Sequence, residues 1–452
     1  MAAFDLALRE LSLPLPAQSP ETNLAAAINS HAIDDPQYWD FSNVSSRAGG
    51  HAFFQYPAMM VPELQGALLD DLIEADPSVS KVYDPFMGSG TILLEAGVRG
   101  LEFHGTDINP LAVLLCQVKA EPPSQAVAAE AGEKVLENAK GDSMSLLYNF
   151  THRDKWFTPA VIAQLSKLRR AIQMIEPIAI RRYLWICLAE TVRLVSNSRI
   201  STFKLHMYDS TTLASRSPNA FKVFDAVCKA NSLRAEEHWA ARRSRDFAFI
   251  EPVLLRGDAT DAFTAPRSEV DVIMTSPPYG DNHTTVPYGQ HSYLPLCWID
   301  HSDLVGVVDP ALLATPSSTD SASLGGSRRF EAGLLQRQAA LYPSLAVFAS
   351  EIASKKHLAA KVSNFIKDYS VSLDLVSERL RPGGYSFFTL GQRRVGGFEM
   401  PLVSLTQEIL EASSHAHVTT VTRRVRRKRM ASKNSLGLTM ATEQVLVMRK
   451  AL

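Results

Sequence analysis

The sequence predicts an α/β fold with a parallel sheet and a mostly helical insertion, and two observations lead to this prediction. A short apolar run at 81–86, a Gly-rich turn, a helical stretch at 91–98 and a second apolar run at 101–108 follow one another within about 30 residues. That order is typical of a strand–helix–strand unit, whose two strands lie parallel in one sheet. Residues 120–245 then carry mostly helical patterns, after which strand-like segments return.

The second half of the chain supplies the remaining strands, so both ends of the chain contribute to one sheet. Residues 311–327 are rich in Ser, Thr and Gly, which is typical of a mobile loop. The other expected elements are, in order, strands at 253–256 and 270–275, a helical stretch at 330–380 interrupted near Pro343, a turn at 381–384, a strand at 385–390, a helix at 401–412, and strands at 418–425 and 444–449.

The composition is that of an ordinary globular protein, with 452 residues, 46% hydrophobic and 21% charged, and a formal net charge of −1. It excludes the disordered and fibrous classes. No apolar run is long enough to span a membrane, and the N-terminus lacks the basic start and apolar block of a secretory signal. Cys116, Cys187, Cys228 and Cys297 stand singly, without disulfide or metal-binding spacing. We therefore expect a reducing, cytoplasmic location and no bound metal.

Residues 84–91 read Asp-Pro-Phe-Met-Gly-Ser-Gly-Thr and join the first strand to the next helix. A strand that ends in a Gly-rich turn and opens a helix leaves backbone N–H groups facing a crevice, where they can bind a phosphate or a carboxylate. The turn has neither the Gly-Lys-Ser/Thr of a Walker loop nor the GxGxxG of a dinucleotide site. It predicts a small-molecule site and disfavours a hydride-transfer cofactor.

Asp107 ends the second predicted strand in the run Gly-Thr-Asp-Ile-Asn-Pro, about 20 residues after the Gly-rich turn. An acidic side chain at this place can accept hydrogen bonds from two ribose hydroxyls. The alternative is that Asp107 only caps the helix that begins at Pro110. The Gly-rich turn upstream favours the ribose role.

Ser276-Pro277-Pro278-Tyr279 follows an apolar strand and so lies at the carboxyl end of the sheet, where ligands bind in open α/β folds. The two prolines have no backbone N–H, which leaves carbonyl acceptors. The Ser276 hydroxyl and a proline carbonyl can together accept both hydrogens of an exocyclic amine. The Tyr279 ring offers a flat face on which a base can stack. The alternative, a plain Pro-rich loop, is disfavoured by the two other motifs in the same chain.

Together these motifs resemble those of the DNA amino-methyltransferases, which move a methyl group from S-adenosyl-L-methionine to an amino nitrogen of a base. In that family Ser-Pro-Pro-Tyr is the usual form in N4-cytosine enzymes, and Asp- or Asn-Pro-Pro-Tyr in N6-adenine enzymes. The resemblance covers residues 51–119 and 251–300 and the strands after 381. It implies a Rossmann-like, seven-stranded mixed sheet of the class I methyltransferase type.

The pattern along the chain and the resemblance together predict a division of the chain into four segments. Residues 1–50 would be an N-terminal adapter or lid, and 51–120 the cofactor-binding half of the methyltransferase domain. Residues 121–250 would be the helical insertion, which is one candidate for target recognition; sequence after 281 is the other. Residues 251–452 would be the catalytic half, with a loop insertion near 300–340.

Carried over residue by residue, the resemblance gives each motif a role. Asp107 would hold the ribose, and Asp258, in Gly257-Asp258, the adenine amino group. Phe54-Gln55-Tyr56-Pro57 resembles the segment that closes over the methionine end of the cofactor. The implied S-adenosyl-L-methionine site comprises Tyr56, Pro57, Asp84, Phe86, Gly88, Gly90, Thr91, Asp107, Ile108 and Asp258, and the implied base site Ser276, Pro277, Pro278 and Tyr279.

The expected reaction is direct attack of a cytosine N4 amine, flipped out of the duplex, on the methyl group. Carbon-5 methylation is disfavoured because none of the four cysteines follows a proline in a matching loop. N6-adenine methylation is chemically close, and Ser276 is the argument against it. An RNA base, a non-catalytic nucleic-acid-binding module and a nucleotide-dependent oxidoreductase are the further alternatives.

DNA is the expected partner, and polar or basic residues in three places are candidates to contact it. Those candidates are Arg199 and Lys204 in a polar stretch, Asn282 and His283 after the catalytic loop, and Arg426 and Lys428 in the basic run 423–429. A solvated surface is the alternative interpretation for each of them. The resemblance adds a cognate restriction endonuclease as a partner, and no membrane partner is expected.

Overall fold

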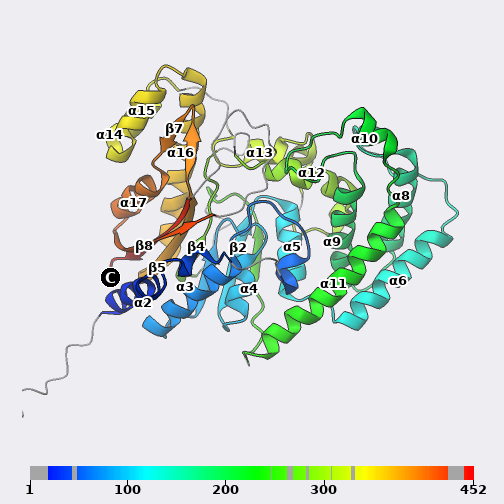
Figure 1. Ribbon diagram of the computed structural model, residues 1–452, viewed down its shortest axis with the longest axis horizontal. Helices are drawn as coiled ribbons and strands as arrows, with labels where there is room; N and C mark the ends of the chain where they lie inside the picture. The colour runs from blue at the N-terminus through cyan, green and yellow to red at the C-terminus, as the bar shows by residue number, and fades with distance from the viewer. Residues whose placement is uncertain are drawn as a thin grey trace, which may run out of the picture.

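The computed structural model describes residues 19–42, 48–245, 247–261, 268–280, 285–306, 308–326, 331–425 and 442–452. Its centre is a seven-stranded sheet with the order β3-β2-β1-β4-β5-β9-β8 (Figure 1). The strands are β1 (Lys81–Asp84), β2 (Glu102–Asp107), β3 (Val253–Arg256), β4 (Val270–Thr275), β5 (Leu380–Gly391), β8 (His415–Arg424) and β9 (Thr442–Lys450). β1 to β5 run parallel, and β9 lies antiparallel to both β5 and β8. This arrangement confirms the predicted mixed sheet of the class I methyltransferase type.

Helices cover both faces of the sheet, because successive strand residues point to opposite sides. Val82 packs into one core and its neighbour Tyr83 into the other. The first face is covered by α2 (Pro20–Asp34), α3 (Pro62–Ala75), α4 (Thr91–Gly97) and α5 (Pro110–Ala120), and the second by α14 (Leu334–Leu341), η7 (Pro343–Leu345), α15 (Ala346–Ile352), α16 (Lys356–Arg379) and α17 (Leu402–Ala412). Across the described ranges, every helix is too short or too polar to traverse a bilayer.

The N-terminal segment, predicted as an adapter or lid, is part of the sheet's covering layer where the structure describes it. α2 packs against α3 and β8 and buries Leu24 and Ile28, and η2 (Tyr38–Asp40) also contacts β8. Glu21 of α2 pairs with Arg449 of β9, which places α2 beside the C-terminus (Figure 1). These contacts lie on the sheet face and not over the pocket described below.

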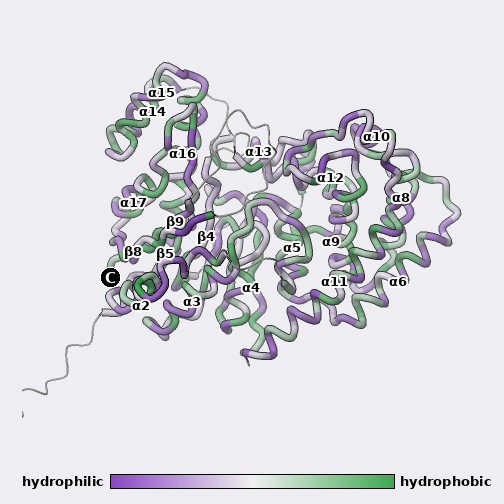
Figure 2. Tube along the Cα trace, in the orientation of Figure 1, coloured by the Kyte–Doolittle hydropathy of each residue, from purple (hydrophilic) through white to green (hydrophobic). Residues whose placement is uncertain are grey.

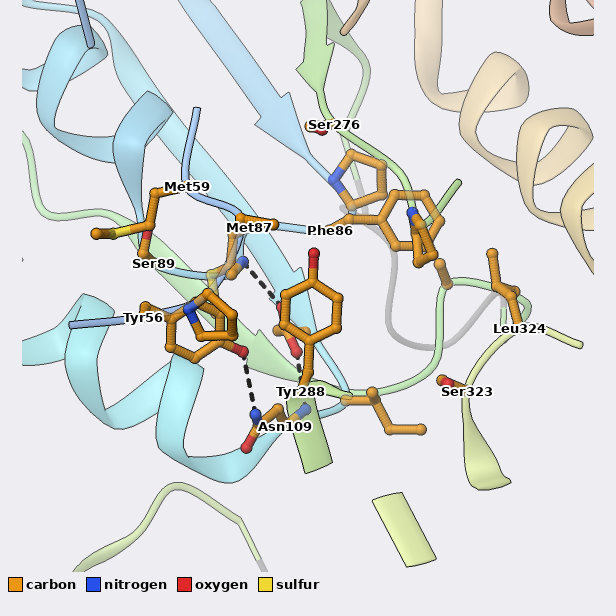
Figure 3. A pocket seen from close by; sticks show the side chains of 18 of the residues that line it. Tyr56, Met59, Phe86, Met87, Ser89, Asn109, Ser276, Tyr288, Ser323 and Leu324 are labelled. Atoms are coloured by element: carbon orange, nitrogen blue, oxygen red, sulfur yellow. Dashed lines mark hydrogen bonds between the residues drawn. The ribbon is translucent and has the colours of Figure 1, made fainter. Parts of the chain in front are cut away.

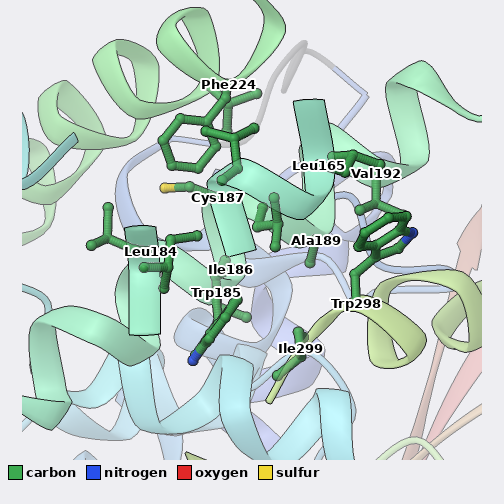
Figure 4. Packing of buried hydrophobic residues seen from close by; sticks show 14 of the residues in the cluster. Leu165, Leu184, Trp185, Ile186, Cys187, Ala189, Val192, Phe224, Trp298 and Ile299 are labelled. Atoms are coloured by element: carbon green, nitrogen blue, oxygen red, sulfur yellow. The ribbon is translucent and has the colours of Figure 1, made fainter. Parts of the chain in front are cut away.

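The predicted helical insertion is confirmed as a bundle that shares its core with the rest of the fold. It contains α6 (Gln125–Gly141), α7 (Arg153–Trp156), α8 (Pro159–Gln173), α9 (Ile178–Val195), α10 (Ser210–Ser215) and α11 (Ala220–Arg243). Hydrophilic and hydrophobic residues alternate along α6 and α11 (Figure 2), as expected for helices with one face on a core. α9 lies at the centre, where Leu184, Trp185, Ile186 and Cys187 are fully buried (Figure 4).

The bundle also holds one helix that lines the pocket and one segment that precedes the pocket residues Tyr56 and Pro57. α12 (Tyr288–Trp298) and η3 (Gly49–Ala52) pack against α9 and α11 respectively. Trp298 of α12 and Phe53 and Phe54, just after η3, belong to the same buried cluster as α9. The insertion is therefore not a separate unit, because it holds chain segments on both sides of the site in position.

Residues 381–384, predicted as a turn before a strand, lie inside β5. The ladder with β4 shifts there from the pair Val270–Leu380 to the pair Val272–Tyr385, so the four residues between bulge out of register. The stretch contains a proline, which has no N–H to donate, and two glycines, which tolerate unusual backbone angles. This composition suits a bulge as well as a turn. A small hairpin, β6 (Arg393–Val395) and β7 (Phe398–Met400), follows β5.

The prediction of a mobile loop at 311–327 is also corrected. The segment contains the end of η6 (Pro310–Leu313) and the helix α13 (Ser318–Ala322); η5 (His301–Asp303) precedes it. Fully buried Asp320 accepts hydrogen bonds from the backbone N–H groups of Gly289 (2.8 Å) and Gln290 (3.2 Å). A carboxylate at a helix N-terminus is stabilised by the free N–H groups there, so Asp320 anchors this segment to the start of α12.

Candidate active site

A pocket of about 820 Å³, open to solvent at its mouth, lies at the carboxyl ends of β1, β2, β3 and β4 (Figure 3). Ten of the sequence-predicted site residues line it: Tyr56, Pro57, Phe86, Gly88, Thr91, Asp107, Ile108, Asp258, Ser276 and Pro278. The other four, Asp84, Gly90, Pro277 and Tyr279, lie behind this wall.

The Gly-rich turn is held by contacts from α5 beneath it. Gly90 has φ +72°, a left-handed conformation that glycine adopts readily, and a Cβ atom there would lie 2.8 Å from the Cys116 sulfur. The buried Lys119 donates a hydrogen bond from its Nζ to the Ser89 carbonyl oxygen at 2.7 Å. A side chain at Gly90 would therefore displace the turn from its support.

Asp107 joins the turn to the end of β2. Its carboxylate accepts the N–H of Gly88 at one oxygen and the N–H of Asn109 at the other, each at 2.8 Å. A carboxylate has about four acceptor positions, so both oxygens retain capacity toward the pocket. The helix-capping alternative does not hold, because Asn109 is the N-cap of α5 and accepts the Leu111 N–H.

Asp84 acts from behind the wall. One carboxylate oxygen accepts hydrogen bonds from the Thr275 hydroxyl (2.6 Å) and the Phe86 N–H (3.0 Å), while the other is buried without a partner among the described residues. Thr275 ends β4 and directly precedes Ser276. Asp84 thus connects the end of β1 to the strand that carries the catalytic loop. Because it does not line the pocket, its predicted effect on the methionine part of the cofactor would be exerted through these neighbours.

Burial dominates the electrostatics of these two carboxyls. It raises the pKa of Asp84 to about 7, although the bonds from Thr275 and Phe86 oppose the shift and the nearby Asp107 adds to it. Burial likewise raises the pKa of Asp107 to about 6, against the two backbone hydrogen bonds. Both acids are therefore poised to titrate near neutral pH.

One wall of the pocket is aromatic, and two residues there, Asn109 and Tyr288, were not predicted as site residues. The rings of Tyr56 and Tyr288 stack with centroids 5.8 Å apart, and the Asn109 amide donates to the Tyr56 hydroxyl at 3.0 Å (Figure 3). The same amide donates to the Ser292 hydroxyl at 2.7 Å. Asn109 stands within the Gly-Thr-Asp-Ile-Asn-Pro motif and could have been noticed, whereas Tyr288 has no local signal.

The Ser-Pro-Pro-Tyr loop presents its serine to the pocket and turns its tyrosine away. The Ser276 hydroxyl lies 3.2 Å from the Tyr279 hydroxyl, which donates to the Glu443 carboxylate at 3.1 Å. The Tyr279 ring packs against the core under α14 to α17. Tyr279 is not among the residues that line this pocket, and its role as a stacking face for the base stays a prediction.

A buried arginine occupies the space beside Gly280, the residue that follows this loop. Arg393 donates from a guanidinium nitrogen to the Tyr279 carbonyl oxygen at 3.2 Å. A Cβ atom at Gly280 would lie 1.5 Å from that guanidinium, so any side chain would expel Arg393 from its position. The Gly280 position thus keeps the backbone of the loop on its support.

Two of the predicted nucleic-acid contacts lie beside the pocket. Arg199 and Lys204 line a smaller cavity of about 410 Å³ together with Gln55 and His291. They belong to a hairpin at 198–207, closed by a backbone bridge between Ser198 and Met207. The other candidates, Asn282, His283, Arg426 and Lys428, lie outside the described residues.

A comparison with known proteins also indicates what kind of enzyme has this pocket. The chain is 28% identical over 439 residues to the Type II methyltransferase M.MvaI of Kocuria varians, covering 92% of this chain and 94% of that protein. No family model matches the sequence. The full-length match, with the strand order of the sheet, supports a methyltransferase.

Solved structures add little to that match. Two structures of the rRNA methyltransferase aviRa from Streptomyces viridochromogenes superpose with TM-scores of 0.33 and 0.31 at 10% and 11% identity. They cover 90% and 91% of this chain and 92% of theirs. At these TM-scores the superpositions carry no argument.

The raised pKa values predict a stability that falls as pH rises. Unfolded aspartates titrate near pH 3.9, so the native chain binds more protons than the unfolded chain between about pH 4 and pH 7. The free energy of unfolding should fall across that window, with Asp84 alone contributing up to about 4 kcal/mol at roughly 1.4 kcal/mol per pKa unit. Urea unfolding at successive pH values measures this slope.

Asp84→Asn isolates the contribution, because an amide keeps the bond from Thr275 but carries no charge. Its slope between pH 5 and pH 8 should be shallower than that of the wild type, and exposed Asp154→Asn in α7 should leave the slope unchanged. Equal slopes in the wild type and Asp84→Asn would contradict the assignment.

Proposed function

We propose that the protein is a DNA methyltransferase that transfers a methyl group from S-adenosyl-L-methionine to the N4 amino group of cytosine. The observation that carries the proposal is the place of Ser276, whose hydroxyl lies at the end of β4 on the wall of a pocket shared with Asp107 and Asp258. A neutral hydroxyl at this place, in Ser-Pro-Pro-Tyr form, favours cytosine N4 within the family that the motifs resemble.

The residues of the pocket fit S-adenosyl-L-methionine. Asp107 has acceptor capacity for two ribose hydroxyls, and Asp258, beyond β3, can accept from the adenine amino group. The Gly88 turn, Phe86 and the stacked Tyr56 and Tyr288 enclose the remaining part. The cofactor supplies an electrophilic methyl group on a sulfonium centre.

The catalytic contribution of the chain is to hold the amine in the right orientation. An amine conjugated to a base ring is a weak nucleophile. In the proposed complex the Ser276 hydroxyl and a proline carbonyl of the same loop would accept its two hydrogens, which would localise the lone pair on nitrogen and aim it at the methyl carbon. Methyl transfer would form the new N–C bond as the S–C bond of the cofactor breaks, and the methylated amine would then release one proton to solvent water at the mouth of the pocket. Positioning and exclusion of water then account for the rate.

Carbon-5 chemistry is disfavoured by the state of the cysteines. That reaction needs a thiolate within reach of the ring. All four cysteines are buried, and burial raises the pKa of the Cys116 thiol, which keeps it protonated. None of the four contributes to the pocket wall formed by the described residues.

The proposed DNA contact is the 198–207 hairpin. Its tip exposes Ile200 and Phe203 beside Lys204. The hairpin is docked against the start of α12, since the Leu205 N–H donates to the Gln290 side chain at 3.3 Å and the Phe203 ring meets the His291 ring at 5.6 Å. Basic and apolar groups next to the pocket suit phosphate contacts beside a base that leaves the DNA helix.

A cognate restriction endonuclease stays a prediction of the resemblance.

The proposed reaction is tested by transfer of labelled methyl from S-adenosyl-L-methionine to mixed-sequence DNA, with nucleoside mass spectrometry of the product. The wild type should form N4-methylcytosine, and Ser276→Ala should lower the rate about a hundredfold because one oriented hydrogen bond to the amine is lost. The matched control is Ser350→Ala, an exposed serine of α15 whose hydroxyl donates to the Val347 carbonyl.

Other products discriminate between the alternatives. N6-methyladenine would keep the fold and cofactor but overturn the choice of base. Transfer to RNA with none to DNA would overturn the choice of nucleic acid. Retained cofactor binding without any transfer would indicate a non-catalytic binding module.

The hairpin is tested by the salt dependence of DNA binding. Each lost phosphate contact lowers the slope of log K against log salt concentration by about 1, so Arg199→Ala with Lys204→Ala should lower it by about 2. Cofactor affinity should not change. Lys229→Ala, an exposed lysine of α11 paired with Asp225, serves as the control. An unchanged slope in the double variant would remove the hairpin from the interface.

A further inference from the structure

A chain of hydrogen bonds links the pocket to the last strand of the sheet. It runs from the Ser276 hydroxyl to the Tyr279 hydroxyl at 3.2 Å, and from there to the Glu443 carboxylate at 3.1 Å. The other oxygen of Glu443 accepts from the Arg423 Nε at 2.7 Å. Glu443 lies on β9, more than 160 residues from the loop, and belongs to none of the sequence motifs.

The chemistry of Glu443 sets the direction of the whole chain. An ionised carboxylate can only accept, so the Tyr279 hydrogen is committed to Glu443. The Tyr279 oxygen must then accept from the Ser276 hydroxyl, whose own hydrogen points away from the pocket. The lone pairs of Ser276 are left to face the pocket as acceptors, which is what an incoming amine needs.

Arg423 holds the Glu443 carboxylate in place. Glu443 and Arg423 are directly opposite one another on β9 and β8, and their side chains are only 12% and 10% exposed. Charge-assisted hydrogen bonds in such shielded places are stronger than those between neutral groups. Asp40 extends this support, since its carbonyl accepts from Arg423 at 3.4 Å and its carboxylate accepts the Arg424 N–H at 2.7 Å.

We propose that Glu443 is a positioning residue for methyl transfer, which acts through Tyr279 to make Ser276 a hydrogen-bond acceptor toward the substrate amine. The inference rests on the proposed function, because it needs an amine to be methylated. It holds for an amine of cytosine or of adenine alike.

Glu443→Gln is the decisive variant because it keeps the shape of the side chain but reverses the direction of its hydrogen bond with Tyr279. Arg423 can only donate, so it requires the amide oxygen, and the amide N–H groups then face Tyr279. Tyr279 would accept from that amide and donate to Ser276, whose own hydrogen would point into the pocket. We expect kcat to fall about tenfold to a hundredfold. The KM for S-adenosyl-L-methionine should stay at the wild-type value, and Glu399→Gln, an exposed glutamate of β7, should change neither.

A double-mutant cycle separates positioning from a structural effect on the sheet. Tyr279→Phe breaks the chain in its middle and should lower kcat to a similar degree. Adding Glu443→Gln to Tyr279→Phe should then cause no further loss, because the path from Glu443 to Ser276 is already cut. If the two losses multiply, Glu443 acts through the sheet and the inference is overturned.

The remaining outcomes are also distinguishable. Wild-type kcat in Glu443→Gln overturns the inference and leaves the proposed function standing. If Glu443→Gln fails to fold, Tyr279→Phe decides alone, and a wild-type kcat in that variant overturns the inference. A wild type that transfers no methyl group to DNA or RNA overturns both the function and the inference.

Discussion

The carboxylate of Asp107 accepts the N–H of Gly88 and the N–H of Asn109, each at 2.8 Å, and this pair of bonds organises the site. One bond holds the Gly-rich turn after β1, and the other sets the start of α5 after β2. Asn109 in turn holds the Tyr56 hydroxyl, so the aromatic wall depends on the same anchor. Placing a buried acid here costs stability at neutral pH, which is typical of functional sites.

The parallel sheet brings these strand ends together, but it supplies only the floor of the pocket. Its walls come from segments before β1 and after β4, which the helical insertion holds in place. α9 is buried along its middle, from Tyr183 to Ala189, and its cluster reaches Tyr56 on one wall and α12 on the other. The insertion and the sheet are thus packed against one another, and a distant strand residue such as Glu443 can act on the catalytic loop through its hydrogen bonds.

The fold and the floor of the site could be predicted because their signals are local. Asp107 and Ser276 each follow an apolar run, and the ends of parallel strands meet at one edge whatever the rest of the chain does. The pocket walls could not be predicted in this way. Tyr288 and Leu324 line the pocket because Asp320 joins α13 to α12 across about 30 residues, and no pattern in their neighbourhood records that contact. The contact between Tyr279 and Glu443 could not be predicted for the same reason, since Glu443 lies on the last strand.

The most direct test of this account is the structure of a complex with S-adenosylhomocysteine. Both ribose hydroxyls should lie within hydrogen-bond distance of the Asp107 carboxylate, and the sulfur should face Ser276. A nucleoside bound elsewhere, or a ribose without contact to Asp107, would contradict the central claim that the ends of β1, β2 and β4 form the site of methyl transfer.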